Sequence, residues 1–105
     1  LDQPILRQTL GLASSYLVTD TSTNPNPSAG ITSWSVGFNR LVDIVVVLHV
    51  RKELELDTFN AASRACSECW SVAGQWRGLD DSREVVRAVA LKLKKLLDDN
   101  ERTYQ

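Results

Sequence analysis

The chain has 105 residues, of which 43% are hydrophobic and 24% charged, and its formal net charge is −1. These values are typical of one soluble globular domain, and they exclude a strong positive field for nucleic acid or anionic lipid. The longest apolar run, Leu41 to Val50, is shorter than the roughly 18 residues of a membrane span and contains Asp43 and His49. We therefore expect no transmembrane segment.

The first residue and the cysteine content bear on origin and compartment. The chain begins with Leu1 and not Met, so we expect a processed product or a piece of a longer protein. No signal peptide is visible, and two cysteines are too few for a disulfide framework. We expect an intracellular protein, of the cytoplasm or the nucleus.

The N-terminal segment has the pattern of a helix. Asp2 and Pro4 are typical of a helix start. Apolar residues then recur at spacings of four, three and four residues, at Leu6, Leu10, Ala13 and Leu17. The segment Asp20 to Gly30 follows, and its two prolines and several Asn, Ser and Thr residues predict a loop.

A second helix is expected from about Thr32 to Leu56. The β-branched residues of Leu41 to Val50 also suit a strand. We favour a helix because a lone strand among helices would leave its backbone groups unpaired. Helical spacing also continues through Phe38, Leu41, Val45 and Leu48. A helix that is apolar on nearly every side belongs in the centre of a bundle.

Two further helices complete the expected fold. Asp57 should cap the third helix and Gly78 should end it, while Asp81 should cap the fourth. The third helix has an apolar seam at Phe59, Ala62, Cys66, Cys69, Ala73 and Trp76, and the fourth at Val86, Val89, Leu93 and Leu96. Residues 98–105 form a polar tail that we expect to fray. We predict a single all-α domain over residues 1–105, a small bundle of about four helices in which helices two to four run antiparallel, up and down.

Cys66 and Cys69 form a CxxC pair, which could be a redox couple or half of a zinc site. His49, the only histidine, could join them in a metal site completed by a carboxylate or by another subunit. We favour a structural role because both cysteines occupy seam positions, where a free cysteine acts as a small buried hydrophobe. We expect no cofactor and no metal.

The fourth helix carries a basic face, Arg83, Arg87 and Lys94, with Lys92 and Lys95 beside it. Such a face could contact nucleic acid, acidic lipid or an acidic partner. Nearby acidic residues dilute the charge, so the face of an ordinary solvated helix is the simpler interpretation. We consider binding of nucleic acid unlikely.

Three tryptophans are a high number for this length. Trp76 lies on the seam of the third helix and is expected in the core. Trp34 and Trp70 either extend the core or are anchors for a partner, because exposed aromatic rings bury much area at low entropic cost. Phe38 on the apolar second helix and Tyr104 in the tail complete the candidate partner-binding residues.

The sequence lacks a catalytic constellation. No glycine-rich phosphate loop occurs, and the acidic residues lie on polar helix faces or at caps. We therefore expect a non-catalytic protein–protein interaction module, a domain of a larger protein or a small subunit of a complex, which binds another protein or a second copy of itself through an apolar groove. One alternative is a metal- or redox-responsive regulator that uses Cys66 and Cys69. Another is nucleic-acid or membrane-surface binding through the basic face.

Overall fold

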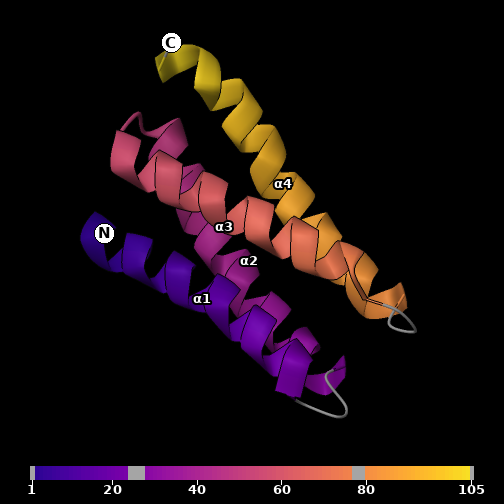
Figure 1. The fold of residues 1–105 in the computed structure, drawn as a ribbon. Coiled ribbons are helices and arrows are strands. Elements are labelled where there is room, and N and C mark those ends of the chain that lie inside the picture. The colour runs from indigo at the N-terminus through magenta and orange to yellow at the C-terminus, as the bar shows by residue number, and fades with distance from the viewer. Residues whose placement is uncertain (1, 24–27, 77–79, 105) are drawn as a thin grey trace.

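The computed structural model describes residues 2–23, 28–76 and 80–104. Across these residues the chain forms four α-helices and no strand: α1 (Gln3–Thr23), α2 (Ser28–Val50), α3 (Leu56–Gly74) and α4 (Asp80–Tyr104). The prediction of a small all-α bundle is confirmed. The helices alternate in direction along the chain, so that α2, α3 and α4 run up, down and up (Figure 1).

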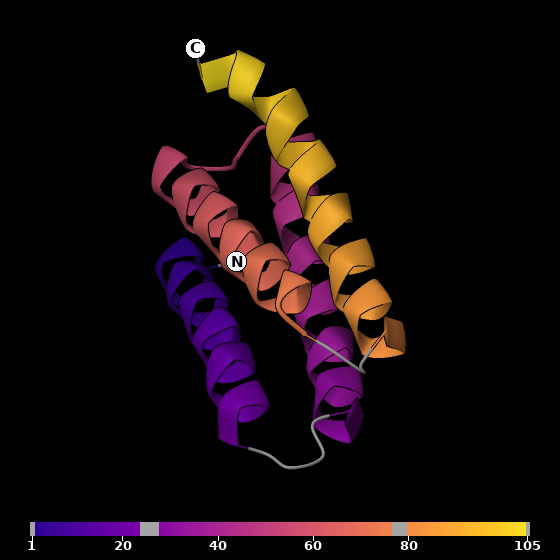
Figure 2. The ribbon, with the colours of Figure 1, turned by 45° about the vertical axis from the view of Figure 1, so that its right-hand side comes forward.

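Helices that follow each other in sequence are not always neighbours in space. α1 packs against α3, α3 against α4, α4 against α2 and, less extensively, α2 against α1. The five residues between α2 and α3 therefore cross a diagonal of the bundle, and Figure 2 shows this link at the end of the bundle opposite the last turn of α1. As a consequence, two neighbouring pairs are parallel, α1 with α3 and α2 with α4.

The described polar contacts follow this parallel arrangement. Near its start α1 contacts α3 through Gln3 and Thr58, and halfway along it contacts α3 again through Ser14 and Glu68. The same order holds between α2 and α4, where Asp43 pairs with Lys92 and, further along both helices, His49 pairs with Asp99.

α2 is a helix throughout its apolar run, as expected from its spacing. Burial against α1 and α4 overrides the strand preference of its β-branched residues. The expectation that α2 lies in the centre of the bundle is wrong: it occupies one corner, and Val36, Val47 and Val50 face outward and are exposed. Four helices of this length form a ring of four neighbouring pairs, which leaves each helix one outer face.

One described segment, Gly30–Val50, is long and apolar enough to cross a membrane by length and composition, with a mean hydropathy of 1.4. The expectation of no transmembrane segment rested on the shorter uninterrupted run. In the bundle, Asp43 in the middle of this segment pairs with Lys92 of α4 at 2.6 Å between Oδ1 and Nζ. Core helices of soluble proteins pass the same test, so length and composition alone are weak evidence for a span.

Several helix boundaries differ from the predictions. The predicted loop Asp20 to Gly30 is too long, because α1 continues to Thr23 and α2 begins at Ser28; both prolines fall in residues 24–27, outside the described residues. Polar Thr and Ser side chains can occupy a last helical turn, since the backbone hydrogen bonds need no apolar partner. The predicted fraying from residue 98 is not observed either, because α4 continues to Tyr104.

The predicted caps of α3 and α4 also shift. Glu55 is the N-cap of α3 and Asp57 lies in its first turn. The helix ends at Gly74, so Trp76 lies beyond it, and the predicted terminator Gly78 is outside the described residues. Because α4 begins at Asp80, Asp81 is its second residue and not its cap. Spacing of apolar residues locates helices but leaves their ends uncertain by a few positions.

The end of α2 has a feature that the sequence did not indicate. Lys52 has a φ of 59°, in the left-handed region, and the N–H groups of Lys52 and Glu53 donate back to the carbonyls of His49 and Leu48. This pair of bonds is the Schellman motif, in which glycine is the usual residue at the left-handed position. A lysine there starts the diagonal link to α3 at a cost in backbone strain.

Candidate functional site

The structure places two of the predicted anchor residues inside the bundle. Trp34 is 9% exposed and Phe38 1%, and their rings stack at 4.7 Å between centroids. The Trp34 indole Nε1 donates to the carbonyl of Ala13 on α1 at 2.8 Å. Trp34 thereby joins α2 to α1, and neither ring is accessible to a partner while the bundle is folded. The side chain of Tyr104 lies outside the described residues.

Trp70 lies on the surface, with 37% of its area exposed. Two cations of α4 lie over its ring: the guanidinium carbon of Arg87 is 5.0 Å from the ring centroid and the Lys94 ammonium 5.7 Å. Both distances are within the roughly 6 Å at which a cation is attracted to an aromatic face. Arg87 and Lys94 of the predicted basic face therefore lie against Trp70, a predicted anchor, whereas the sequence predicted the basic face and Trp70 as separate features.

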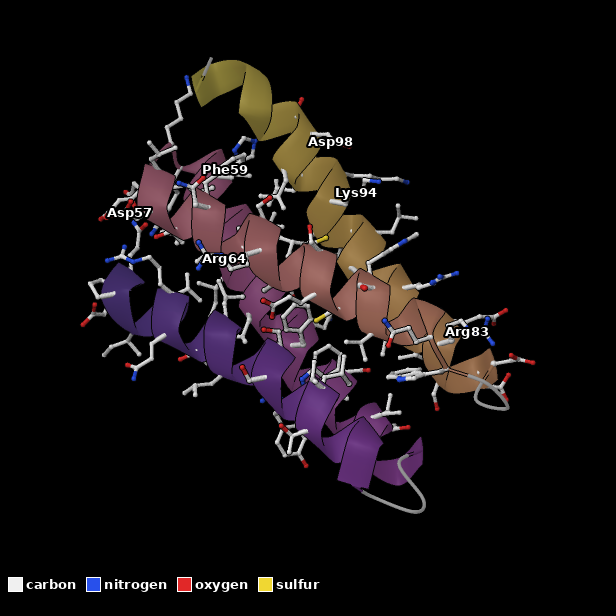
Figure 3. All side chains as sticks on the ribbon, viewed as in Figure 1. Asp57, Phe59, Arg64, Arg83, Lys94 and Asp98 are labelled. Carbon is white, nitrogen blue, oxygen red and sulfur yellow. The ribbon has the colours of Figure 1, made fainter. Side chains whose placement is uncertain are left out.

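A hollow of about 300 Å³ between α3 and α4 begins at Trp70. α3 contributes a row of serines one turn apart, Ser63, Ser67 and Ser71, and α4 contributes Leu97 and Asp98 together with Lys94. The short serine side chains leave the space open along the helix axis. We call this hollow the Trp70 groove. Figure 3 shows Lys94 and Asp98 one turn apart on α4, and Arg83 at the other end of that helix.

One of the two cysteines, Cys66, lies at the Trp70 groove. Cys66 lines it and is 5% exposed, so that with buried Leu97 it forms the floor. The Cys66 thiol donates to the carbonyl of Ala90 at 3.2 Å, which joins α3 to α4. Cys69 is 1% exposed and lies deeper.

The environment of both cysteines opposes thiolate chemistry. Burial raises the pKa of the Cys66 thiol, although the positive charge of Lys94 offsets part of that effect. Burial, with the nearby Cys66 and Glu68, raises the pKa of Cys69 to about 12. Reactive cysteines and metal ligands need a thiolate at neutral pH. Among the described residues, no group of three or more His, Cys, Asp and Glu side chains is placed to hold a metal ion.

Three other charged residues of α4, Arg83, Lys92 and Asp99, pair within the protein. Arg83 pairs with Asp80 on its own helix and Lys92 with Asp43 of α2. His49, considered above as a ligand, lies 3.5 Å from Asp99, measured from Nε2 to Oδ2. The cations of the predicted basic face therefore have different neighbours: Arg83 and Lys92 pair with aspartates, whereas Arg87 and Lys94 lie over Trp70.

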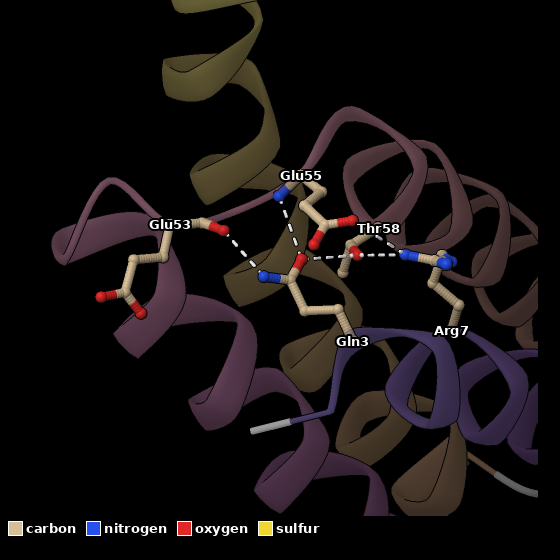
Figure 4. Close-up of polar contacts among 5 residues, drawn as sticks. All are labelled: Gln3, Arg7, Glu53, Glu55 and Thr58. Carbon is tan, nitrogen blue, oxygen red and sulfur yellow. Dashed lines mark hydrogen bonds and ion pairs between the residues drawn. The ribbon is translucent and has the colours of Figure 1, made fainter.

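A second polar cluster lies at the opposite edge of α3, which we call the Gln3 corner (Figure 4). The amide of Gln3 donates to the carbonyl of Glu53 at 2.7 Å, and its oxygen accepts from the backbone N–H of Glu55 at 3.0 Å and from the Thr58 hydroxyl at 2.8 Å. Arg7 completes the cluster with contacts of 3.3 Å to Thr58 and to the Glu55 carboxylate. Gln3 thereby caps α3 from another helix, which sequence spacing cannot reveal.

No protein-family model, curated protein or solved structure matches this chain. The residues of the Trp70 groove and the Gln3 corner are therefore interpreted from their own geometry and chemistry.

Proposed function

We propose that this domain is a non-catalytic protein-interaction module that binds a segment of another protein chain in the Trp70 groove. One observation carries the proposal: Trp70 is a half-exposed ring at the end of a hollow, whereas Trp34 and Trp76 are buried. Half-exposed tryptophans beside pockets are the residues that most often anchor interfaces, because a rigid ring buries much apolar area.

The surroundings of Trp70 support an anchoring role. The Arg87 and Lys94 side chains lie against the ring, so part of their conformational freedom is already lost before a partner binds. The floor made by Cys66 and Leu97 is apolar, which favours the burial of an aliphatic or aromatic side chain of the partner. The serine hydroxyls along one wall offer hydrogen bonds to that partner.

The test compares affinity capture by the wild-type domain with capture by two variants. Trp70→Ala removes the anchor, and Tyr16→Ala removes an exposed aromatic ring of α1 that lies outside the groove. We expect proteins retained by the wild type and by Tyr16→Ala to fall about tenfold or more with Trp70→Ala. Circular dichroism should show the same helix content in all three proteins.

Equal retention of the same proteins by Trp70→Ala and by the wild type would contradict the proposal. Loss of helix content in Trp70→Ala would show that the Trp70 ring is needed for folding. Trp70→Phe, which keeps an aromatic ring, would then take the place of Trp70→Ala in the comparison.

A further inference from the structure

The two cations beside Trp70 differ from Arg83 and Lys92 of the same helix in having no acidic partner among the described residues. Arg83 and Lys92 each pair with an aspartate. Within the described residues, Arg87 and Lys94 form no salt bridge, although both lie over the same ring. A carboxylate that approached the exposed edge of Trp70 would therefore meet two cations at once.

The charge changes sign along the groove. Lys94 lies near Trp70, and Asp98 lies one turn further along α4, on the same groove. A ligand that fills the groove would match it with an acidic group at the Trp70 end and a basic group at the Asp98 end. This order of charge opposes a uniform polyanion, which Asp98 would repel.

The shape of the groove favours a helix as the ligand. The groove runs along two packed helices. On its α3 side the side chains one turn apart are short, those of Ser63, Ser67 and Ser71, so that this wall of the groove is shallow. A third helix can lie in such a groove with its apolar side chains on Cys66 and Leu97 and its polar flanks toward the rims.

We infer that the Trp70 groove takes an amphipathic helix of a partner protein, with acidic residues beside Arg87 and Lys94. The inference rests on the proposed function and adds the chemistry of the ligand. Exposed ion pairs contribute little each, so the charge selects the partner and its direction more than it sets the affinity.

The probes are two synthetic amphipathic helical peptides with identical apolar residues. One carries glutamates only at the end of its polar flank that would lie beside Arg87 and Lys94, and the other carries lysines at the same positions. Calorimetric titration measures both against the wild type, Arg87→Gln, Lys94→Gln and Lys95→Gln. Lys95 is the matched control, because it is the next residue of α4, is exposed and contacts no described aromatic ring. We expect the glutamate peptide to bind at least fivefold or so tighter than the lysine peptide, and Arg87→Gln or Lys94→Gln to weaken it roughly threefold. Lys95→Gln should leave it unchanged.

Equal binding of the two peptides, lost in Trp70→Ala, would overturn the preference for acidic residues while leaving the proposed function in place. Binding of neither peptide would overturn the inference of a helical ligand, and the affinity capture described above would then decide the proposed function separately. A duplex DNA probe that bound in a Lys94-dependent way would also overturn the inference, because it would assign the cations to nucleic acid.

Discussion

The Gln3 corner and the Trp70 groove lie on the two sides of α3, and both combine polar and charged side chains with buried surface. In the Gln3 corner, the amide of Gln3 has a partner for its donor and its acceptor, and Thr58 is fully buried. At the groove, Arg87 and Lys94 lie over the Trp70 ring and form no salt bridge among the described residues, and the buried Nε of Arg87 makes no hydrogen bond. A polar group whose hydrogen-bonding partners lie within the protein stabilises the fold, whereas a polar group without such a partner can bind another molecule.

The largest expected effect is in the Gln3 corner. Gln3→Leu would leave the part-buried N–H of Glu55 and the buried hydroxyl of Thr58 without an acceptor. We expect the free energy of unfolding to fall by about 3 kcal/mol, since each unsatisfied buried group costs about 1–3 kcal/mol. Urea denaturation measures it, and the exposed Gln8→Leu is the control, with a change within about 0.5 kcal/mol. A loss below about 1 kcal/mol for Gln3→Leu would remove the distinction between the two clusters.

The next effect concerns Cys69, the more deeply buried of the two cysteines. In the unfolded chain the Cys69 thiol ionises near its ordinary pKa of 9.0, whereas in the folded protein burial raises this pKa to about 12. Between these values the unfolded chain binds fewer protons, so the free energy of unfolding should fall as pH rises, by at most about 1.4 kcal/mol per pH unit. Below pH 9 the contribution is fully present.

Cys69→Ala isolates this contribution, because every other titrating group stays in place. Urea denaturation over a pH series from neutral to about pH 11 should give a shallower decline for Cys69→Ala than for the wild type. Identical declines would show that the Cys69 thiol ionises in the folded protein as it does in the unfolded chain, and would reopen the redox interpretation of the pair.

A smaller effect is expected in the link beside the Gln3 corner. Lys52→Gly removes a side chain from a left-handed residue, so we expect the free energy of unfolding to rise by about 1 kcal/mol. Lys52→Ala is the control, because alanine carries the same left-handed penalty and should give no such gain. Thermal or urea unfolding measures both variants, and equal stabilities would contradict the Schellman geometry of this link.

The smallest effect on stability is expected beside the groove. A Cβ added in Gly74→Ala would lie 2.9 Å from Nη2 of Arg87, so the guanidinium must shift, whereas in Gly37→Ala the new methyl meets nothing within 4 Å. We expect Gly37→Ala to stabilise the protein by about 0.5–1 kcal/mol and Gly74→Ala by less. Only Gly74→Ala should alter tryptophan emission, through the contact of Arg87 with Trp70. Equal spectra for both variants would place Arg87 away from the ring.

The tryptophans show which parts of the site could be read from the sequence. All three are visible as unusual residues, and the seam spacing of α3 correctly indicated that Trp76 is buried. The same reasoning proposed Trp34 and Trp70 as equivalent anchors, yet Trp34 is buried against α1 and Trp70 is exposed. Periodicity gives the face of a helix on which a residue lies, but the neighbour of that face depends on the order of helices around the bundle.

The sequence by itself determined that this chain is helical, the approximate positions of its four helices and much of the core face of each, because apolar spacing within a helix is a local property. In α4 the predicted seam residues Val89 and Leu96 are only partly buried, and their neighbours Ala90 and Leu97 are buried instead. Only the tertiary structure decided that α2 and α3 lie across a diagonal, that Gln3 caps α3, and that Arg87 and Lys94 lie over Trp70. Each of these features joins residues that are distant in sequence and depends on which helices become neighbours. That choice is made by the packing of whole helix faces and leaves no signal in the local spacing of residues.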